Sequence, residues 1–173
     1  MLKNSHGPRI RGGSGVALTG RGKGFGLAGW LAACFCAAAG GVVFPPGPWY
    51  ALLQKPSWTP PGWIFGPVWT ALYVLMALAA WLVWSRAGFA GARVALGLFL
   101  LQLVLNAAWS WLFFGLHRPG LALAEIVALW ILLLATLVVF WRRRPLAGAL
   151  LVPYLLWVSL ASALNWELWR MNG

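Results

Sequence analysis

Residues 49–69 read WYALLQKPSWTPPGWIFGPVW, and this stretch decides how the rest of the chain is interpreted. It is dense in tryptophan and proline, and it lies between two apolar runs that are each long enough to cross a bilayer. The tandem prolines Pro60 and Pro61 cannot continue a helix from their N-terminal side, but they suit the first turn of the next helix. We therefore expect residues 45–60 to form a rigid lid joined to a helix start. Because tryptophan rings need a matching surface, this lid is interpreted as one wall of a binding site.

The composition is that of a polytopic membrane protein. Hydrophobic residues make up 62% of the chain and charged residues 9%, with a mean hydropathy of +0.80, which excludes a soluble domain of this size. About 20 apolar residues cross the roughly 30 Å hydrocarbon core. The predicted fold class is all-α, an integral membrane five-transmembrane-helix bundle over residues 25–173. Its spans are expected at residues 25–44, 61–84, 94–115, 120–141 and 146–168.

The 13 lysines and arginines, which give a net charge of +11, are read as topology signals. They lie mainly in the connections between spans, so we expect no nucleic-acid partner. With five spans, three cations fall on the side of the lid, and these are Lys55, Arg118 and Arg170. The other side carries Lys3, Arg9, Arg11, Arg21, Lys23, Arg86, Arg93, Arg142, Arg143 and Arg144. The positive-inside rule then predicts a multi-pass protein of the bacterial cell membrane with a cytoplasmic N-terminus.

The N-terminal region is divided into a tail and a first span. Residues 1–24 are basic and Gly-rich without apolar periodicity, and we expect a disordered tail close to anionic lipid. A cleaved signal peptide is the alternative, but the apolar run continues to Phe44, which favours a retained helix. Small residues at four-residue spacing would let this helix approach another closely, either in its own bundle or in a second subunit of a homodimer. They are Gly29, Ala33, Ala37 and Gly41.

Three of the predicted spans carry aromatic and amide side chains in stripes at helical spacing. The second span has Trp69, Tyr73, Met76 and Ala80; the third has Gln102, Asn106, Trp109 and Phe113; the fifth has Tyr154, Trp157, Ala161 and Asn165. Each amide taken alone is explained by an interhelical hydrogen bond, whereas the three stripes together favour one shared cavity. Tryptophans near span ends are interpreted as interfacial belt residues, namely Trp30, Trp81, Trp84, Trp141 and Trp169.

The sequence contains no candidate residues for conventional acid–base or nucleophilic catalysis. Glu125 and Glu167 are the only acids; the first can be a helix-start charge and the second a local partner of Arg170. His6 and His117 are too far apart in sequence to argue for a metal site. No nucleophile is paired with a base, and no phosphate loop occurs. We expect neither a metal nor a conventional catalytic residue.

Three segments resemble the tryptophan-rich sensory protein and translocator protein family (TspO/MBR). They are WYALLQKPSWTPPGWIFGPVWTALYVLM from residue 49, QLVLNAAWSWLFFG from residue 102 and VPYLLWVSLASALNW from residue 152. The resemblance implies a five-helix bundle, usually dimeric, whose first loop closes over a pocket for porphyrins, haem, synthetic isoquinoline or benzodiazepine ligands and sterols. By motif it places six residues in that pocket: Tyr50, Trp69, Asn106, Trp109, Trp157 and Ala161. Phe113 occupies a pocket position that varies among relatives, and Trp166 replaces the tyrosine of the vertebrate sterol motif, which argues against cholesterol.

The leading functional hypothesis is a membrane receptor or carrier for tetrapyrroles with a sensory or regulatory role in tetrapyrrole or stress metabolism. It needs no cofactor, and protoporphyrin or haem is the ligand. Trp69, Trp109 and Trp157 would stack on the ligand, while Gln102 and Asn106 orient its polar edges. Lys55 and Arg118 would pair with its carboxylates. The first alternative is a light- and oxygen-dependent enzyme that degrades porphyrin with Trp69 and Trp157 as redox partners; the second is a regulatory subunit that acts through protein partners.

Overall fold

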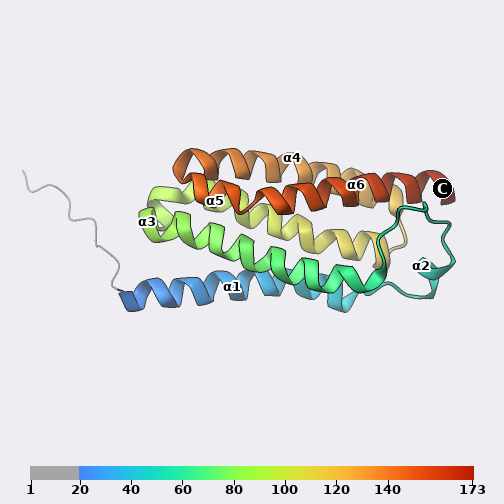
Figure 1. The fold of residues 1–173 in the computed structure, drawn as a ribbon, viewed down its shortest axis with the longest axis horizontal. Coiled ribbons are helices and arrows are strands. Elements are labelled where there is room, and N and C mark those ends of the chain that lie inside the picture. Colours follow the sequence, from blue (N-terminus) through green and yellow to red (C-terminus); the bar gives the residue numbers. More distant parts are fainter. Residues whose placement is uncertain (1–19) are drawn as a thin grey trace, which may run out of the picture.

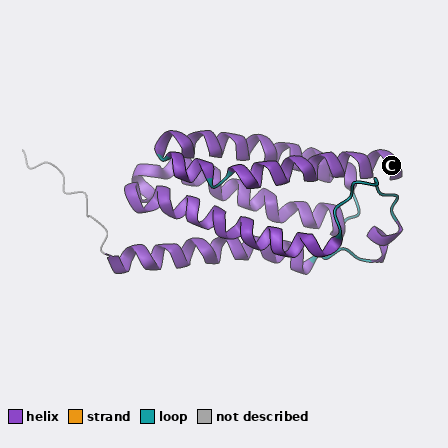
Figure 2. Cartoon of the chain, in the orientation of Figure 1, coloured by secondary structure: helices purple, strands orange, loops and turns teal. Residues whose placement is uncertain are grey.

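The structure is a computed structural model that describes the backbone of residues 20–173, and side chains from residue 24. Residues 1–19, and with them most of the predicted tail, lie outside the described residues. Every regular element in the described part is helical, which confirms the all-α fold (Figure 2). The elements are α1 (Gly20–Val43), α2 (Pro48–Leu52), α3 (Gly62–Ser110), η1 (Trp111–Gly115), α4 (Pro119–Arg143), α5 (Pro145–Ala149) and α6 (Val152–Asn172).

Helix α3 and its continuation η1 contain two membrane spans rather than one. Together they cover 54 residues, and a straight helix of that length would be roughly 80 Å long, more than twice the hydrocarbon thickness. The chain reverses at Gly88, whose φ of +63° lies in the left-handed region, and at Ala92, whose φ is −124°. In Figure 1 the green half of α3 runs away from α2 and the yellow half returns. With α1, α4 and the α5–α6 pair, the described chain therefore forms a bundle of five rods, which is the architecture that the five-span prediction requires.

Prolines mark where helices begin. Pro61 directly precedes α3, Pro119 and Pro145 open α4 and α5, and Pro48 opens the short α2, which the sequence analysis did not anticipate. The fifth span was predicted as one helix but is divided into α5 and α6. Pro153 has no N–H with which to reach the carbonyl of Ala149, the last residue of α5, so the ladder is interrupted there.

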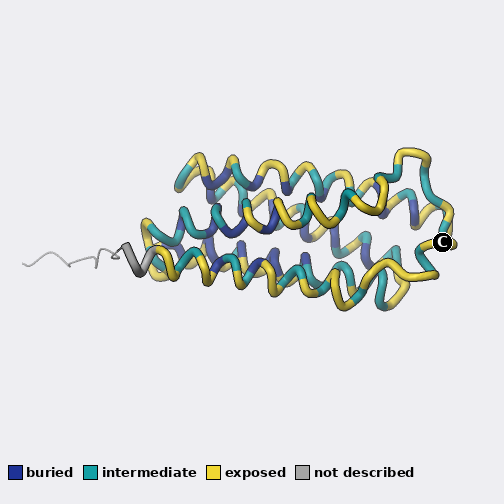
Figure 3. Tube along the Cα trace, turned by 60° about the horizontal axis from the view of Figure 1, so that its bottom comes forward, coloured by how far each residue is buried: buried dark blue, intermediate teal, exposed yellow. Residues whose placement is uncertain are grey.

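Helix α1 packs along α3, and its buried face differs from the small-residue stripe. Trp30 and Cys34 are buried, and the Trp30 ring meets Phe99 edge to face at 5.6 Å. Trp30 is therefore a core residue and not the interfacial residue that its position near a span end suggested. The bundle buries the inner faces of its helices and leaves many Leu and Val side chains on its outer surface (Figure 3). That outer surface is the one a bilayer would cover.

The two ends of the bundle differ in charge. The turn between the halves of α3 lies at the same end as the α4–α5 junction, because Arg143 donates to the carbonyl of Gly91 at 2.8 Å and Arg144 to that of Leu82 at 3.4 Å. The N-terminal end of α1 is also there, whereas α2, the lid and the C-terminus lie at the opposite end (Figure 1). The cations that the described chain places in connections are therefore grouped as the five-span prediction required.

Candidate functional site

The three predicted stripes meet at the Asn106 side chain. The Tyr73 hydroxyl donates to Asn106 Oδ1 at 2.6 Å, and Asn106 Nδ2 donates to the Tyr154 hydroxyl at 2.9 Å. One residue from each half of α3 and one from α6 are thus joined, and all three are buried. We call these three residues the Asn106 bracket.

Aromatic rings surround the bracket on the side of the lid. Trp69 stacks on Tyr73 with ring centroids 5.4 Å apart and meets Tyr154 edge to face at 6.0 Å. Trp157, on α6, meets Phe65 edge to face at 5.6 Å. Trp69 and Trp157, two of the three predicted pocket tryptophans, therefore each contact other aromatic rings. Phe65 was not singled out from the sequence, although it lies four residues before Trp69 and so extends that stripe by one turn.

A second hydrogen-bonded level lies nearer the lid. Trp109 Nε1 donates to Asn165 Oδ1 at 3.0 Å, and Asn165 Nδ2 donates to the carbonyl of Pro119 at 2.8 Å. Phe113 is buried and stacks on Trp109 at 5.0 Å. It lies in η1, where the helix widens so that the Leu116 N–H bonds to the carbonyl of Trp111 at 2.8 Å. Such π-helical turns are frequent at functional sites.

The lid covers this second level with two aromatic rings. Tyr50 meets Phe114 at 5.4 Å and Phe113 at 6.2 Å, and Trp49 stacks on His117 at 4.4 Å. Burial raises the pKa of the Tyr50 hydroxyl, which therefore stays protonated. Residues 45–60 thus lie over the end of the helices that carry the stripes.

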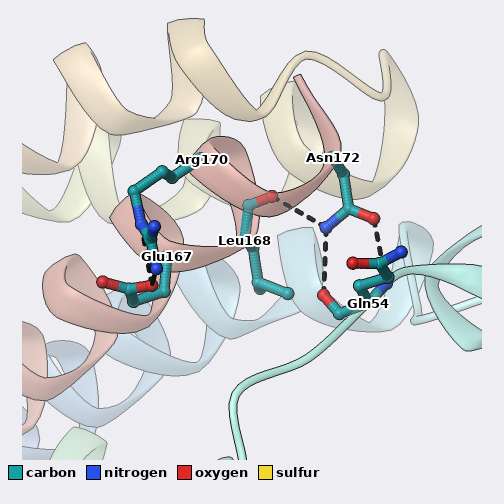
Figure 4. A network of polar contacts seen from close by, with 5 residues as sticks. All are labelled: Gln54, Glu167, Leu168, Arg170 and Asn172. Atoms are coloured by element: carbon teal, nitrogen blue, oxygen red, sulfur yellow. Dashed lines mark hydrogen bonds and ion pairs between the residues drawn. The ribbon is translucent and has the colours of Figure 1, made fainter.

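The lid is also hydrogen-bonded to the C-terminal end of α6, a contact that no sequence motif predicted. The Gln54 N–H donates to Asn172 Oδ1 at 2.9 Å, and Asn172 Nδ2 donates back to the carbonyl of Gln54 at 2.9 Å (Figure 4). Asn172 is itself held by the carbonyl of Leu168 at 2.9 Å. The same figure shows Arg170 paired with Glu167 at 2.6 Å, the local ion pair that their spacing suggested.

The remaining predicted residues lie in different surroundings. Lys55 Nζ sits 4.7 Å from the centroid of the Tyr50 ring and donates to the carbonyls of Ala51 and Leu53. Arg118 is exposed and immediately precedes α4. Ala161 is half-buried against the core, and Gln102 is fully buried without a hydrogen-bond partner on either amide atom.

The small-residue stripe of α1 lies mainly outside the helix contacts of the bundle. A Cβ at Gly29 would meet nothing within 4 Å, and one at Gly41 only Ser110 Oγ at 3.8 Å. Ala37 is half-buried against the core, and Ala33 lines a hollow of about 280 Å³ beside Trp30. Close approach within the bundle occurs instead at Gly40, where a Cβ would lie 2.7 Å from the carbonyl oxygen of Ala107.

Between the stripes, the rings contact one another. The two best-formed hollows of the described part of the chain lie elsewhere, one beside α1 and one of about 220 Å³ at the C-terminus. A flat ligand would therefore have to displace the lid and turn Trp69, Trp157 or Phe113 outward. The site offers stacking surfaces and buried amides, which suit recognition of an aromatic ligand.

Comparison with known proteins agrees with this architecture. The model of the TspO/MBR family matches residues 28–170. The chain is 43% identical over 145 residues to protein CrtK of Rhodobacter capsulatus, covering 83% of this chain and 90% of the relative. It is 42% identical to the tryptophan-rich sensory protein of Cereibacter sphaeroides, covering 83% and 89% respectively. It is also 45% identical to the human translocator protein over 126 residues, covering 72% of this chain and 75% of the relative.

Proposed function

We propose that this chain, which belongs to the TspO/MBR family, is a membrane receptor or carrier for tetrapyrroles with a sensory or regulatory role. The observation that carries the proposal is the convergence of the three stripes. Tyr73, Asn106 and Tyr154 are joined by hydrogen bonds, and Trp69 lies against the two tyrosines. Buried amides and hydroxyls inside an aromatic cluster form the kind of interior that binds a large conjugated ligand.

In the proposed complex, the ligand enters from the lid end and stacks on Trp69, Trp109 and Trp157. Its propionates remain at the mouth, where Lys55 and Arg118 supply positive charge. Lys55 would then exchange its two backbone carbonyls for a carboxylate, which is a stronger, charge-assisted partner. We place the lid outside the cell and the N-terminus in the cytoplasm, because most cations lie at the opposite end of the bundle.

A titration of the detergent-solubilised protein with protoporphyrin IX in the dark tests this proposal. Saturable quenching of tryptophan fluorescence is expected, and Trp69→Phe combined with Trp157→Phe should weaken the apparent affinity by about tenfold or more. The matched control removes two exposed tryptophans, Trp141 and Trp169, in the same way, and should leave the affinity unchanged. Unsaturable quenching, or equal losses in both double variants, would contradict the proposal.

Illumination of the same samples tests the enzymatic alternative. A porphyrin-degrading enzyme should form a new absorbing product that is absent from the Trp69 and Trp157 double variant. Bleaching equal to that of free porphyrin would exclude the enzymatic alternative.

We also propose a homodimer that uses the outer face of α1. Gly29 and Gly41 are exposed and make no close contact with the rest of the chain. Small residues on a lipid-facing surface permit close helix association. Gly29→Leu should shift the protein to monomers in light-scattering chromatography, and an unchanged mass would exclude this face.

A further inference from the structure

The hydrogen bonds inside the bundle show which polar groups are free to meet a ligand. Both side-chain atoms of Asn106 are used by Tyr73 and Tyr154, and both of Asn165 by Trp109 and Pro119. Each amide thus uses one of its two N–H donors and one of the two lone pairs of its oxygen to hold helices together. A ligand that relied on Asn106 would have to share the amide with the bracket.

Of the two acids, both of which lie in the described part of the chain, Glu125 is the one without a hydrogen-bond partner. Both of its carboxyl oxygens are buried, and neither has a hydrogen-bond donor. The other acid, Glu167, is satisfied by Arg170 at the C-terminal end. Leaving a buried carboxyl unpaired is costly, which favours a role that supplies the missing donor.

Glu125 lies on the inner face of α4 rather than toward lipid. It lies three residues after Ala122 and four before Leu129, and both of these are buried on the inner face of α4. Helix α4 packs against α3 and α6, the helices that carry the stripes, so a ligand that parted these helices would reach the inner face of α4.

The chemistry of a carboxyl group then restricts what the ligand presents to it. In either protonation state a carboxyl oxygen accepts hydrogen bonds, and when ionised it only accepts. A propionate arriving at Glu125 would bring like charge and a second acceptor. A ligand edge with several N–H donors would instead donate charge-assisted hydrogen bonds to both oxygens of the ionised Glu125 carboxylate.

We propose that Glu125 is a specificity-determining residue that selects open-chain tetrapyrroles over closed macrocycles. In an open chain the pyrrole and lactam N–H groups lie along an accessible edge, whereas in a closed free-base porphyrin they point to the ring centre. The inference rests on the proposed tetrapyrrole-binding function and narrows its ligand class. It also orients the ligand, with the N–H edge at Glu125 and the propionates at Lys55 and Arg118.

The test compares biliverdin with protoporphyrin IX, which carry the same pair of propionates and differ in the open ring. Tryptophan quenching is titrated with each compound in the dark, and the ratio of the two Kd values is taken within one protein preparation. This ratio does not depend on the fraction of correctly folded protein, so a partly misfolded variant remains informative.

The unsubstituted protein should bind biliverdin about tenfold or more tightly than protoporphyrin IX. Glu125→Met, which fills a similar volume without an acceptor, should bring the ratio close to one. Glu125→Gln, with one acceptor, should give an intermediate ratio. Glu167→Gln is the matched control, because it removes the other acid, which lies at the end of the bundle. This variant should bind biliverdin in preference to protoporphyrin IX as strongly as the unsubstituted protein does.

The possible failures are distinct. If neither tetrapyrrole quenches the tryptophan fluorescence saturably, both the proposed function and this inference are contradicted. If both bind but without preference, or if Glu125→Met retains the preference, only the role of Glu125 is overturned and tetrapyrrole binding stands.

Discussion

Asn106 forms hydrogen bonds with the hydroxyls of both Tyr73 and Tyr154. We therefore expect its substitution to lower the free energy of unfolding strongly. Asn106→Leu keeps the volume but leaves the Tyr73 and Tyr154 hydroxyls buried and unpaired. Each orphaned hydroxyl costs about 1–3 kcal/mol, so we expect a clear fall in the free energy of unfolding. Denaturant titration in mixed micelles, followed by circular dichroism, measures it.

The control for this prediction removes the hydroxyls as well. In the triple variant Asn106→Leu, Tyr73→Phe and Tyr154→Phe, no polar atom of the bracket remains unpaired. Replacing all partners by apolar groups is nearly neutral, so much of the stability should return. A triple variant that is as unstable as Asn106→Leu would show that the bracket acts through shape alone.

The sequence identified the residues that meet at the site but not the partners they choose. The four-residue spacing of Asn106 and Trp109 with their neighbours was enough to place them on one inner face. The spacing could not show that both polar side-chain atoms of Asn106 are hydrogen-bonded while those of Gln102 and Glu125 have no partner. Which side chains form hydrogen bonds with one another depends on how three helices are rotated and shifted relative to each other. The residue spacing within one helix does not determine this.

At the scale of elements, the lid and α6 are coupled through two hydrogen bonds between the Asn172 side chain and the Gln54 backbone. Asn172→Ala removes both bonds to Gln54. At about 0.5–1.5 kcal/mol each, their loss should speed amide hydrogen exchange in residues 45–60 by about fivefold or more. Mass spectrometry of exchange in lid peptides is the measurement, with peptides from α4 as the internal reference.

Asn172→Asp distinguishes the two bonds. The carboxylate still accepts from the Gln54 N–H but cannot donate to the Gln54 carbonyl, so lid exchange should lie between that of the unsubstituted protein and that of Asn172→Ala. Equal lid exchange in all three proteins would mean that aromatic contacts of Trp49 and Tyr50 hold the lid without Asn172.

Two glycines of α1 have opposite surroundings and give a matched pair of substitutions. A Cβ at Gly40 would lie 2.7 Å from the Ala107 carbonyl oxygen, so Gly40→Ala should push α1 away from α3 at a cost of about 1–3 kcal/mol. Gly29→Ala meets open space, and the change should be neutral or slightly stabilising. Thermal unfolding in detergent compares the two, and equal shifts would contradict the close contact at Gly40.

Helix starts were more predictable than helix breaks. The tandem proline before Gly62 marked the start of α3 because a ring without an N–H is tolerated only in the first turn. Within the fifth span, Pro153 was read as part of one helix although it separates α5 from α6. Local chemistry signals where a helix is allowed to begin, whereas continuity across a proline depends on how neighbouring helices pack.

For the whole molecule, hydropathy and length were sufficient to predict the bundle. Each span had to be about 20 residues long, and the short connections forced neighbours to be antiparallel. The reversal is made by two residues with non-helical backbone angles, Gly88 and Ala92, inside an otherwise helical stretch. Membrane thickness, a property outside the chain, is what requires two spans in the 54 residues from Gly62 to Gly115.

That requirement has a consequence for the two ends of the chain. If residues 62–115 cross the membrane twice, the total is five crossings and the N- and C-termini lie on opposite sides; a single crossing would give four and place them on the same side. With the basic end in the cytoplasm, the C-terminus should be outside.

A green fluorescent protein fused after Gly173 should be dark, and alkaline phosphatase fused there should be active. The same reporters fused after Arg144 should show the reverse, because that junction lies at the basic end. Fluorescence from both green fluorescent protein fusions would mean that α5–α6 does not cross. An exact reversal of the pattern would arise either from four crossings or from an inverted protein with five. A reporter fused after Lys55 separates these two cases, because the lid shares a side with Gly173 only if the chain crosses five times.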